Sequence, residues 1–308
     1  MDQPMNLLTP RTPPEGPPPA ISVAVPVLDG GERLVTLAMA LTNQVVGAGP
    51  IEILLADSGS TDGATERAAA ACGARILDVA PGHFDHGLVR AALVVQARAP
   101  LVAFFSQDAV PRGERFLEAL AAPFEDEQVA GAHARQVARP GADPLTRATL
   151  ERWTPALGAP YVLRTLPPGG PSLPAAERMR LARFDNVASM VRRCHALDIP
   201  FPAREFGEDL AWGWATLTAG RSLAYVPSAV VEHSHAPTLR AIYERNVLAH
   251  RQASREFDLV TVPGALAGLI ALASGVPSDL RDGGARWALA GIPRRAAALL
   301  GQWRGAQS

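Results

Sequence analysis

The chain has 308 residues, enough for one large domain or two small ones, and a formal net charge of −1 at pH 7. All of its basic residues other than histidine are arginines, and no global basic field points to nucleic acid as a partner. The sequence does not begin with a basic segment followed by an apolar core, so we expect no secretory signal and a cytoplasmic protein.

After a proline-rich lead over 1–20, predicted to be disordered, strands and helices alternate. The expected strands are 21–28, 51–57, 74–80 and 100–108. The expected helices are 31–44, one that starts after Ser60 or Thr61 as a cap, and 86–99. This alternation predicts an α/β fold with a doubly wound, mostly parallel sheet.

The second half of the chain is less regular. Proline and glycine interrupt residues 139–180, which we expect to form loops. A helix is expected to begin at Glu208-Asp209, and a strand over 221–235 ends in histidines. The remainder reads as helical, so we expect an α/β domain over 21–250 and a helical extension over 251–308.

Polar residues stand at the predicted strand ends. Asp57 and Asp108 each end a strand, and in doubly wound sheets ligands bind at the carboxyl ends of the strands. The turn after the first strand lacks G-x-G-x-x-G, and a chain without lysine has no G-x-x-x-x-G-K-[ST] loop. We therefore expect no dinucleotide here, and a nucleotide only if another device holds it.

An ordered set of motifs carries a family resemblance. It runs from Ile21 to about His235 and reads VPVLDGG, ADSGSTDGA, HFDHGLVR, FFSQDAVP, FDNVASMVRR and GEDLAWGWATLTAGRSLAYVPSAVVEHSH. The chain resembles the family 2 glycosyltransferases of GT-A fold, and within them the rhamnosyltransferase-like branch. The resemblance implies inverting transfer of a sugar, rhamnose in that branch, from a nucleotide-diphosphate sugar to a saccharide or lipid-linked acceptor in cell-surface polysaccharide or glycolipid synthesis. It also implies a divalent metal, Mg²⁺ or Mn²⁺, on the diphosphate.

The resemblance assigns candidate metal ligands. Asp108 matches the last residue of the family's D-x-D motif, and Ser106 stands where the first Asp would be. A carboxylate at a strand end supplies the oxygen ligand that a hard cation needs. His233 matches the family's histidine that reaches the metal or the diphosphate, with His235 in reserve. The alternatives are a solvated Asp before a proline turn and an exposed histidine pair.

The resemblance also assigns catalytic and donor-binding residues. Asp209 is expected to be the base that deprotonates the acceptor hydroxyl, with Glu208 as its supporting neighbour or an acceptor ligand. Two acids at a helix start also favour the positive end of the helix dipole, which is the alternative. Asp57 and Asn186 could instead cap turns. The expected donor- or substrate-binding residues are Pro26, Val27, Asp57, Ser58, Arg90, Gln107 and Asn186.

The tail leaves two readings open. Residues 259–276 carry no charge but include Pro263 and three glycines, so they fall short of a membrane span. Residues 281–308 combine five arginines and one aspartate with apolar residues and tryptophans. They form either a helix lying on an anionic membrane, at the inner face of the plasma membrane, or helices packed on the domain or in a homodimer.

Two other functions compete with glycosyl transfer. One is a catalytically inactive sugar-nucleotide-binding or scaffold protein, which would have no need of the predicted base. The other is a nucleotidyltransferase, which usually needs a basic glycine-rich loop after the first strand, and this sequence has none.

Overall fold

The computed structural model describes residues 7–259 and 265–307, which belong to two compact units. The first unit comprises Met1–Gln136, Ala156–Pro171 and Leu181–His233, and the second comprises Val137–Pro155, Ser172–Arg180 and Ser234–Ser308. Residues 1–6 of the predicted lead and 260–264 of the predicted apolar segment lie outside the described residues.

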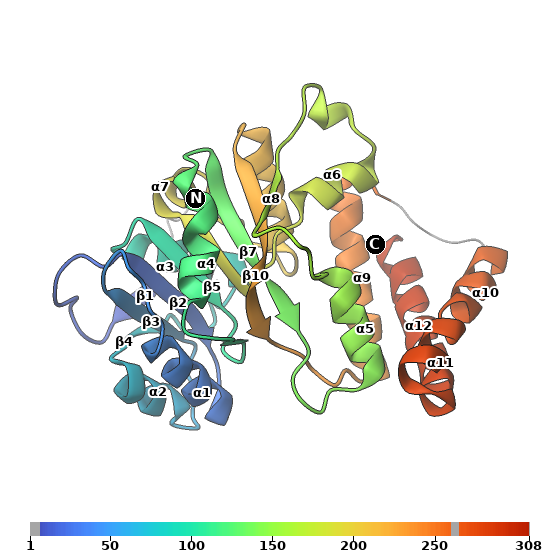
Figure 1. Ribbon diagram of the computed structural model, residues 1–308, viewed down its shortest axis with the longest axis horizontal. Helices are drawn as coiled ribbons and strands as arrows, with labels where there is room; N and C mark the ends of the chain where they lie inside the picture. Colours follow the sequence, from blue (N-terminus) through green and yellow to red (C-terminus); the bar gives the residue numbers. More distant parts are fainter. Residues whose placement is uncertain (1–6, 260–264, 308) are drawn as a thin grey trace. The chain divides into compact units, whose positions relative to one another are not determined.

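One sheet organises the first unit (Figure 1). Its strands are β1 Leu8–Pro10, β2 Ile21–Val27, β3 Ile51–Asp57, β4 Arg75–Val79, β5 Leu101–Phe105, β6 Val110–Pro111, β7 Val129–Val137, β8 Val162–Arg164, β9 Ala188–Arg192 and β10 Ser222–Glu232. They follow the order β1-β4-β3-β2-β5-β9-β7-β10-β6, and β8 pairs with β10. The strands β4, β3, β2 and β5 are parallel, which confirms the predicted core, whereas β9 runs antiparallel to β5 and β7.

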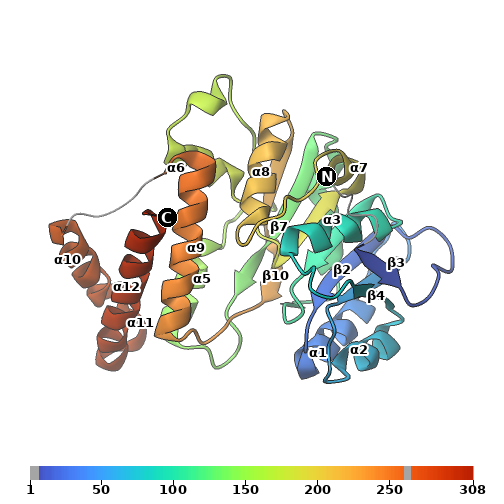
Figure 2. The same ribbon diagram turned by 180° about the vertical axis from the view of Figure 1, so that it is seen from behind.

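Helices cover both faces of this sheet (Figures 1 and 2). The first unit contains α1 Gly31–Thr42, α2 Ala64–Cys72, α3 His86–Gln96, α4 Phe116–Ala121, α7 Arg193–Asp198 and α8 Glu208–Thr218. Helices α1, α2 and α4 share one apolar core with β2. On the other face, Phe104 of β5 packs on Phe201, which stacks on Trp212 of α8. Because helices cover both faces, every residue of β2 is buried, as its continuous apolar run predicts.

The predicted disordered lead is wrong for its middle part. Leu8–Pro10 forms β1, which pairs antiparallel with β4, and Leu8 is buried. Arg11 then bonds to the carboxylates of Asp57, Glu66 and Asp78. Proline content predicted disorder because it is a local signal, whereas an edge strand and a distant acidic cluster hold this segment.

Two predicted boundaries move by two or three residues. Helix α2 begins at Ala64 rather than after Ser60 or Thr61, because the backbone N–H groups and hydroxyls of both residues bond to strand-end aspartates instead. Strand β5 ends at Phe105, and Asp108 follows in a turn that the Ala109 N–H closes onto the Ser106 carbonyl.

The predicted loop over 139–180 is also wrong in part. It contains α5 Pro144–Trp153 and most of α6 Ala175–Ala182, together with β8. Asp143 caps α5 by accepting from the Thr146 N–H, and proline is well tolerated at the first helical position. The prediction of loops treated Pro144 as a helix breaker, whereas it is the first residue of α5.

The second unit is mainly helical, with α9 Leu239–Phe257, α10 Ala265–Ser274, α11 Val276–Gly283 and α12 Ala285–Gly305. The boundary predicted between residues 250 and 251 therefore falls inside α9. Gly301 and Gly305 of α12 lie so close to the α9 backbone carbonyls of Tyr243 and Val247 that a side chain would not fit. Among the described residues, none of the helices is both long enough and apolar enough to cross a bilayer.

Candidate active site

The loops that follow β2, β3 and β5 are joined by hydrogen bonds. Gln107 pairs with the backbone of Leu28 through both atoms of its amide, at 2.9 and 3.0 Å. Asp29 N–H donates to Ser60 Oγ, and Thr61 N–H donates to Asp29 Oδ1. The carboxyl edge of the parallel strands is therefore preorganised, and Gln107 aligns the turn that carries Asp108.

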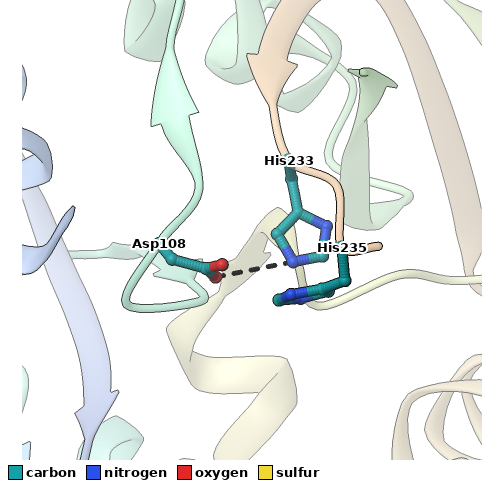
Figure 3. Close-up of side chains that lie close together, drawn as sticks. All are labelled: Asp108, His233 and His235. Atoms are coloured by element: carbon teal, nitrogen blue, oxygen red, sulfur yellow. Dashed lines mark ion pairs between the residues drawn. The ribbon is translucent and has the colours of Figure 1, made fainter. Parts of the chain in front are cut away.

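Asp108 and His233 face one another at this edge (Figure 3). His233 directly follows β10, and its Nε2 lies 3.5 Å from Asp108 Oδ1. With His235, two residues later, the three side chains offer ligand atoms that all lie within 4.8 Å of one another. One carboxylate and two imidazoles fit a divalent cation such as Mn²⁺, whose remaining ligands would be phosphate or water oxygens.

Glu208 and Asp209 open α8, as predicted. Gly207 precedes them with a φ of 75°, a left-handed conformation that suits glycine. Glu208 is 7% exposed, and its Oε1 lies 2.5 Å from Nη1 of Arg90, which is equally buried. The pair Arg90–Glu208 thus neutralises itself inside the protein, so the structure places Arg90 beside the acidic pair.

Asp209 is in a different electrostatic environment. Its Oδ1 accepts from the Leu210 N–H, and its Oδ2 accepts from the Asn186 N–H at 3.3 Å. Burial, followed by the negative charges of Glu208 and Asp185, raises the pKa of Asp209 to about 8. A carboxylate whose pKa lies near working pH has the basicity needed to accept a proton from a hydroxyl.

The segment 185–187 connects these groups. Asp185 Oδ2 accepts a hydrogen bond from Gln136 Nε2. The other amide atom of Gln136, Oε1, lies 3.0 Å from His233 Nδ1. Asn186 donates to Asp209. The carbonyl oxygen of Val187 accepts a hydrogen bond from the Ser106 N–H, and Ser106 begins the turn that carries Asp108. Three consecutive residues therefore connect the Asp108–His233 pair to Asp209 within one unit.

Two of the predicted donor-binding residues, Asp57 and Ser58, lie at the end of β3. Asp57 is 3% exposed, and its carboxylate accepts from Ser60 and from Arg11 at 3.2 Å. These contacts correspond to the alternative reading, in which Asp57 holds a turn. The Ser58 hydroxyl is buried and finds no hydrogen-bond partner among the described residues, and its contact with a donor stays a prediction.

Three other predicted donor- or substrate-binding residues, Pro26, Val27 and Asn186, are buried. Pro26 and Val27 are buried in β2, and the Val27 carbonyl accepts from the Ser58 N–H, so contact of either residue with a donor would pass through the backbone. Asn186 is 2% exposed and bonds to both acidic residues of α8. The donor contacts of all three remain predictions.

Sequence reasoning missed three residues of this region. Arg33 Nη1 of α1 lies 3.8 Å from Asp108 Oδ2, Arg11 holds Asp57, and Gln136 contacts His233. Arg33 stands close to the first strand-end turn, which could have singled it out. Neither Arg11 nor Gln136 lies in a recognisable motif, and only the sheet brings them to these partners.

Residues 22–187, more than half of the chain, match the sequence model of the family described as Glycosyl transferase family 2. The chain belongs to this family. The predicted resemblance is therefore confirmed, and this glycosyltransferase has the mixed α/β fold expected of it. The matched range contains Asp57 and Asp108 but ends before α8 and the histidines.

One curated relative of this glycosyltransferase is the O-antigen chain rhamnosyltransferase WbaN of Salmonella anatum. The two are 27% identical over 198 residues, which cover 64% of this chain and 60% of WbaN. The match thus spans less than two thirds of that enzyme's length.

Solved structures share the fold at low identity. The mannosyltransferase PcManGT of Pyrobaculum calidifontis, solved with GDP-Man and Mn²⁺, has a TM-score of 0.57 and is 15% identical; the match covers 96% of this chain and 76% of that one. The S. aureus protein TarS, residues 1–349 with UDP, has a TM-score of 0.54 and is 14% identical, with 92% and 91% covered. These likenesses support the GT-A fold.

Proposed function

We propose that this family 2 glycosyltransferase transfers a sugar, with inversion, from a nucleotide-diphosphate sugar to a hydroxyl of a saccharide or lipid-linked acceptor. The observation that carries the proposal is the connection through residues 185–187 of two unlike groups, the Asp108–His233 pair and the basic carboxylate of Asp209. Inverting transfer needs both a cation-binding pair for the diphosphate and a base for the acceptor.

In this mechanism Asp209 accepts the proton of the acceptor hydroxyl. The hydroxyl oxygen forms a bond to the anomeric carbon while the bond from that carbon to the diphosphate oxygen breaks, so a single displacement inverts the configuration. Asp108 and His233, with His235 in reserve, would hold Mn²⁺ or Mg²⁺, which supplies positive charge to the leaving diphosphate when bound. Glu208 stays paired with Arg90 and fixes the start of α8.

Rhamnose is the proposed sugar, and cell-surface polysaccharide or glycolipid is the proposed product class. Support comes from the similarity to WbaN, a rhamnosyltransferase of an O-antigen chain. The donor-binding role proposed for the first-half loops draws on the fold shared with structures that hold GDP-Man or UDP.

A panel of nucleotide-diphosphate sugars, tested by thermal shift with and without Mn²⁺, checks the donor class. A donor present at 100 times its dissociation constant should stabilise the protein by about 2.7 kcal/mol. We expect stabilisation by at least one rhamnose or hexose donor, larger with Mn²⁺, followed by transfer to a saccharide acceptor. Binding without transfer to any acceptor would favour the inactive binding protein, and no stabilisation by any donor would contradict the proposal.

A second property, peripheral membrane contact, is favoured by one face of α12. Leu289, Ile292, Leu300 and Trp303 are 70, 41, 60 and 48% exposed, and their helical spacing places them on one side. Arg286 and Arg304 are also exposed on this helix. Since Gly301 and Gly305 pack on α9, the two readings of the tail are compatible: one face packs and another can lie on anionic lipid at the inner face of the plasma membrane.

We expect the double substitution Leu300→Glu and Trp303→Glu to lower co-sedimentation with anionic liposomes, because it puts negative charge on the apolar face. Substitution is preferable to truncation, since α12 also covers α9. Met39→Glu, at a 58% exposed position of α1, is the matched control, and nucleotide binding should not change in either variant. Equal sedimentation of all forms would contradict membrane contact, and loss of a dimer would assign this face to self-association.

A further inference from the structure

The orientation of the Gln136 amide is determined by Asp185. Gln136 is 6% exposed and lies near the end of β7. Its neighbour Asp185 accepts the Val187 N–H through Oδ1 and faces the Gln136 amide through Oδ2. A carboxylate accepts hydrogen bonds and donates none when ionised, so the amide group that faces it must be the NH₂.

This orientation determines the proton position on His233. With Nε2 of Gln136 directed at Asp185, its Oε1 lies 3.0 Å from His233 Nδ1. An amide oxygen only accepts, so Nδ1 must carry a proton. In the neutral ring Nε2 then has a lone pair, and it lies 3.5 Å from Asp108 Oδ1. Two electron-rich atoms facing each other at this distance favour a positively charged species between them.

We propose that Gln136 is a positioning residue that holds His233 in the Nδ1–H tautomer, so that Nε2 and Asp108 together face the divalent cation. The inference rests on the proposed function, which supplies the cation. Metal-binding histidines generally donate their other ring N–H to a carboxylate, carbonyl or water, and removal of such a partner typically lowers metal affinity by about 10–100-fold. Here the side-chain amide oxygen of Gln136 accepts the His233 ring N–H, and Asp185 prevents the amide from exchanging the positions of its oxygen and nitrogen.

The test combines ring ¹⁵N NMR of histidine-labelled protein with Mn²⁺ titration followed by electron paramagnetic resonance. His233→Gln identifies the His233 signals. In the neutral form of the His233 ring of the unsubstituted protein we expect the proton on Nδ1 and not on Nε2. Gln136→Met should release the ring to the other tautomer and weaken Mn²⁺ binding by about 10–100-fold.

Gln44→Met is the matched control, because the Gln44 amide also bonds through both atoms, to the Gly113 carbonyl and the Leu117 N–H, and lies in another loop. It should leave the His233 signals and Mn²⁺ affinity unchanged. Asp185→Asn provides a second, milder test: the new amide can donate to Gln136 Oε1, so Gln136 can turn over and the Nδ1–H preference should be lost.

A proton on Nε2 in the unsubstituted protein, or unchanged tautomer and Mn²⁺ affinity in folded Gln136→Met and Asp185→Asn, would overturn the inference. Failure of the proposed function gives a different result. In that case the Nδ1–H tautomer is present and depends on Gln136, but no form of the protein takes up Mn²⁺, which overturns the ligand role of Nε2 while leaving the amide contact in place.

Discussion

Asp209→Asn should lower glycosyl transfer by about 10²–10⁴-fold while the affinity for the donor stays close to that of the unsubstituted protein. The substitution keeps the size of the side chain and removes the basic oxygen that would accept the acceptor proton. A group that acts only in the reaction step changes turnover and not donor binding. Single-turnover rates and donor dissociation constants, measured side by side, check this.

The pH dependence follows from the raised pKa of Asp209. A base must be ionised, so kcat/KM should rise with pH and level off above about 8. The free energy of unfolding should instead fall as pH rises. Between the pKa of an unfolded Asp, about 3.9, and the folded value, only the folded protein holds this proton, so its contribution to stability falls as pH rises through that window. In Asp209→Asn, the pH dependence that this carboxylate causes should be lost both from kcat/KM and from the free energy of unfolding.

Glu208→Gln is the matched control. It neutralises one partner of a buried ion pair and so removes the carboxylate that Arg90 contacts, and breaking a buried pair typically costs about 3–5 kcal/mol. We therefore expect a lower melting temperature and, for the folded fraction, a milder loss of turnover than in Asp209→Asn. Near-normal turnover in Asp209→Asn would contradict its role as the base and leave only the helix-dipole reading.

Asp108→Ala is expected to remove most of the benefit of Mn²⁺ for donor binding, at least about tenfold in affinity, because it deletes the carboxylate of the Asp108–His233 pair. The fold should be retained, since Asp108 lies in a turn after β5 and not within a strand. Calorimetric titration of a nucleoside diphosphate with and without Mn²⁺ measures the effect.

Asp126→Ala is the control for that titration. Asp126 is an exposed aspartate that precedes the start of β7, whereas Gln136, which contacts His233, lies at the other end of the same strand. It should leave the Mn²⁺ effect intact. If Asp108→Ala shows the same Mn²⁺-dependent affinity as this control, the assignment of Asp108 as a metal ligand is wrong.

Local patterns in the sequence predicted the parallel core and the start of α8. Continuous apolar runs such as 21–27 occur where a strand is buried on both faces, and alternation with helical periods leaves few topologies. The same patterns placed Asp57 at the end of β3 and Glu208 at the start of α8, because strand ends and helix starts have local signals. The order of the motifs along the chain is sufficient to indicate the family.

The tertiary structure alone decided which polar groups are partners. Arg90 and Glu208 are separated by 118 residues, and Gln136 and His233 by 97, so no window of sequence contains either contact. The edge strand Leu8–Pro10 likewise depends on β4, and without that partner its proline-rich surroundings predict disorder. Basicity at Asp209 arises from burial and two neighbouring charges, which depend on how the chain folds back on itself and not on the residue types alone.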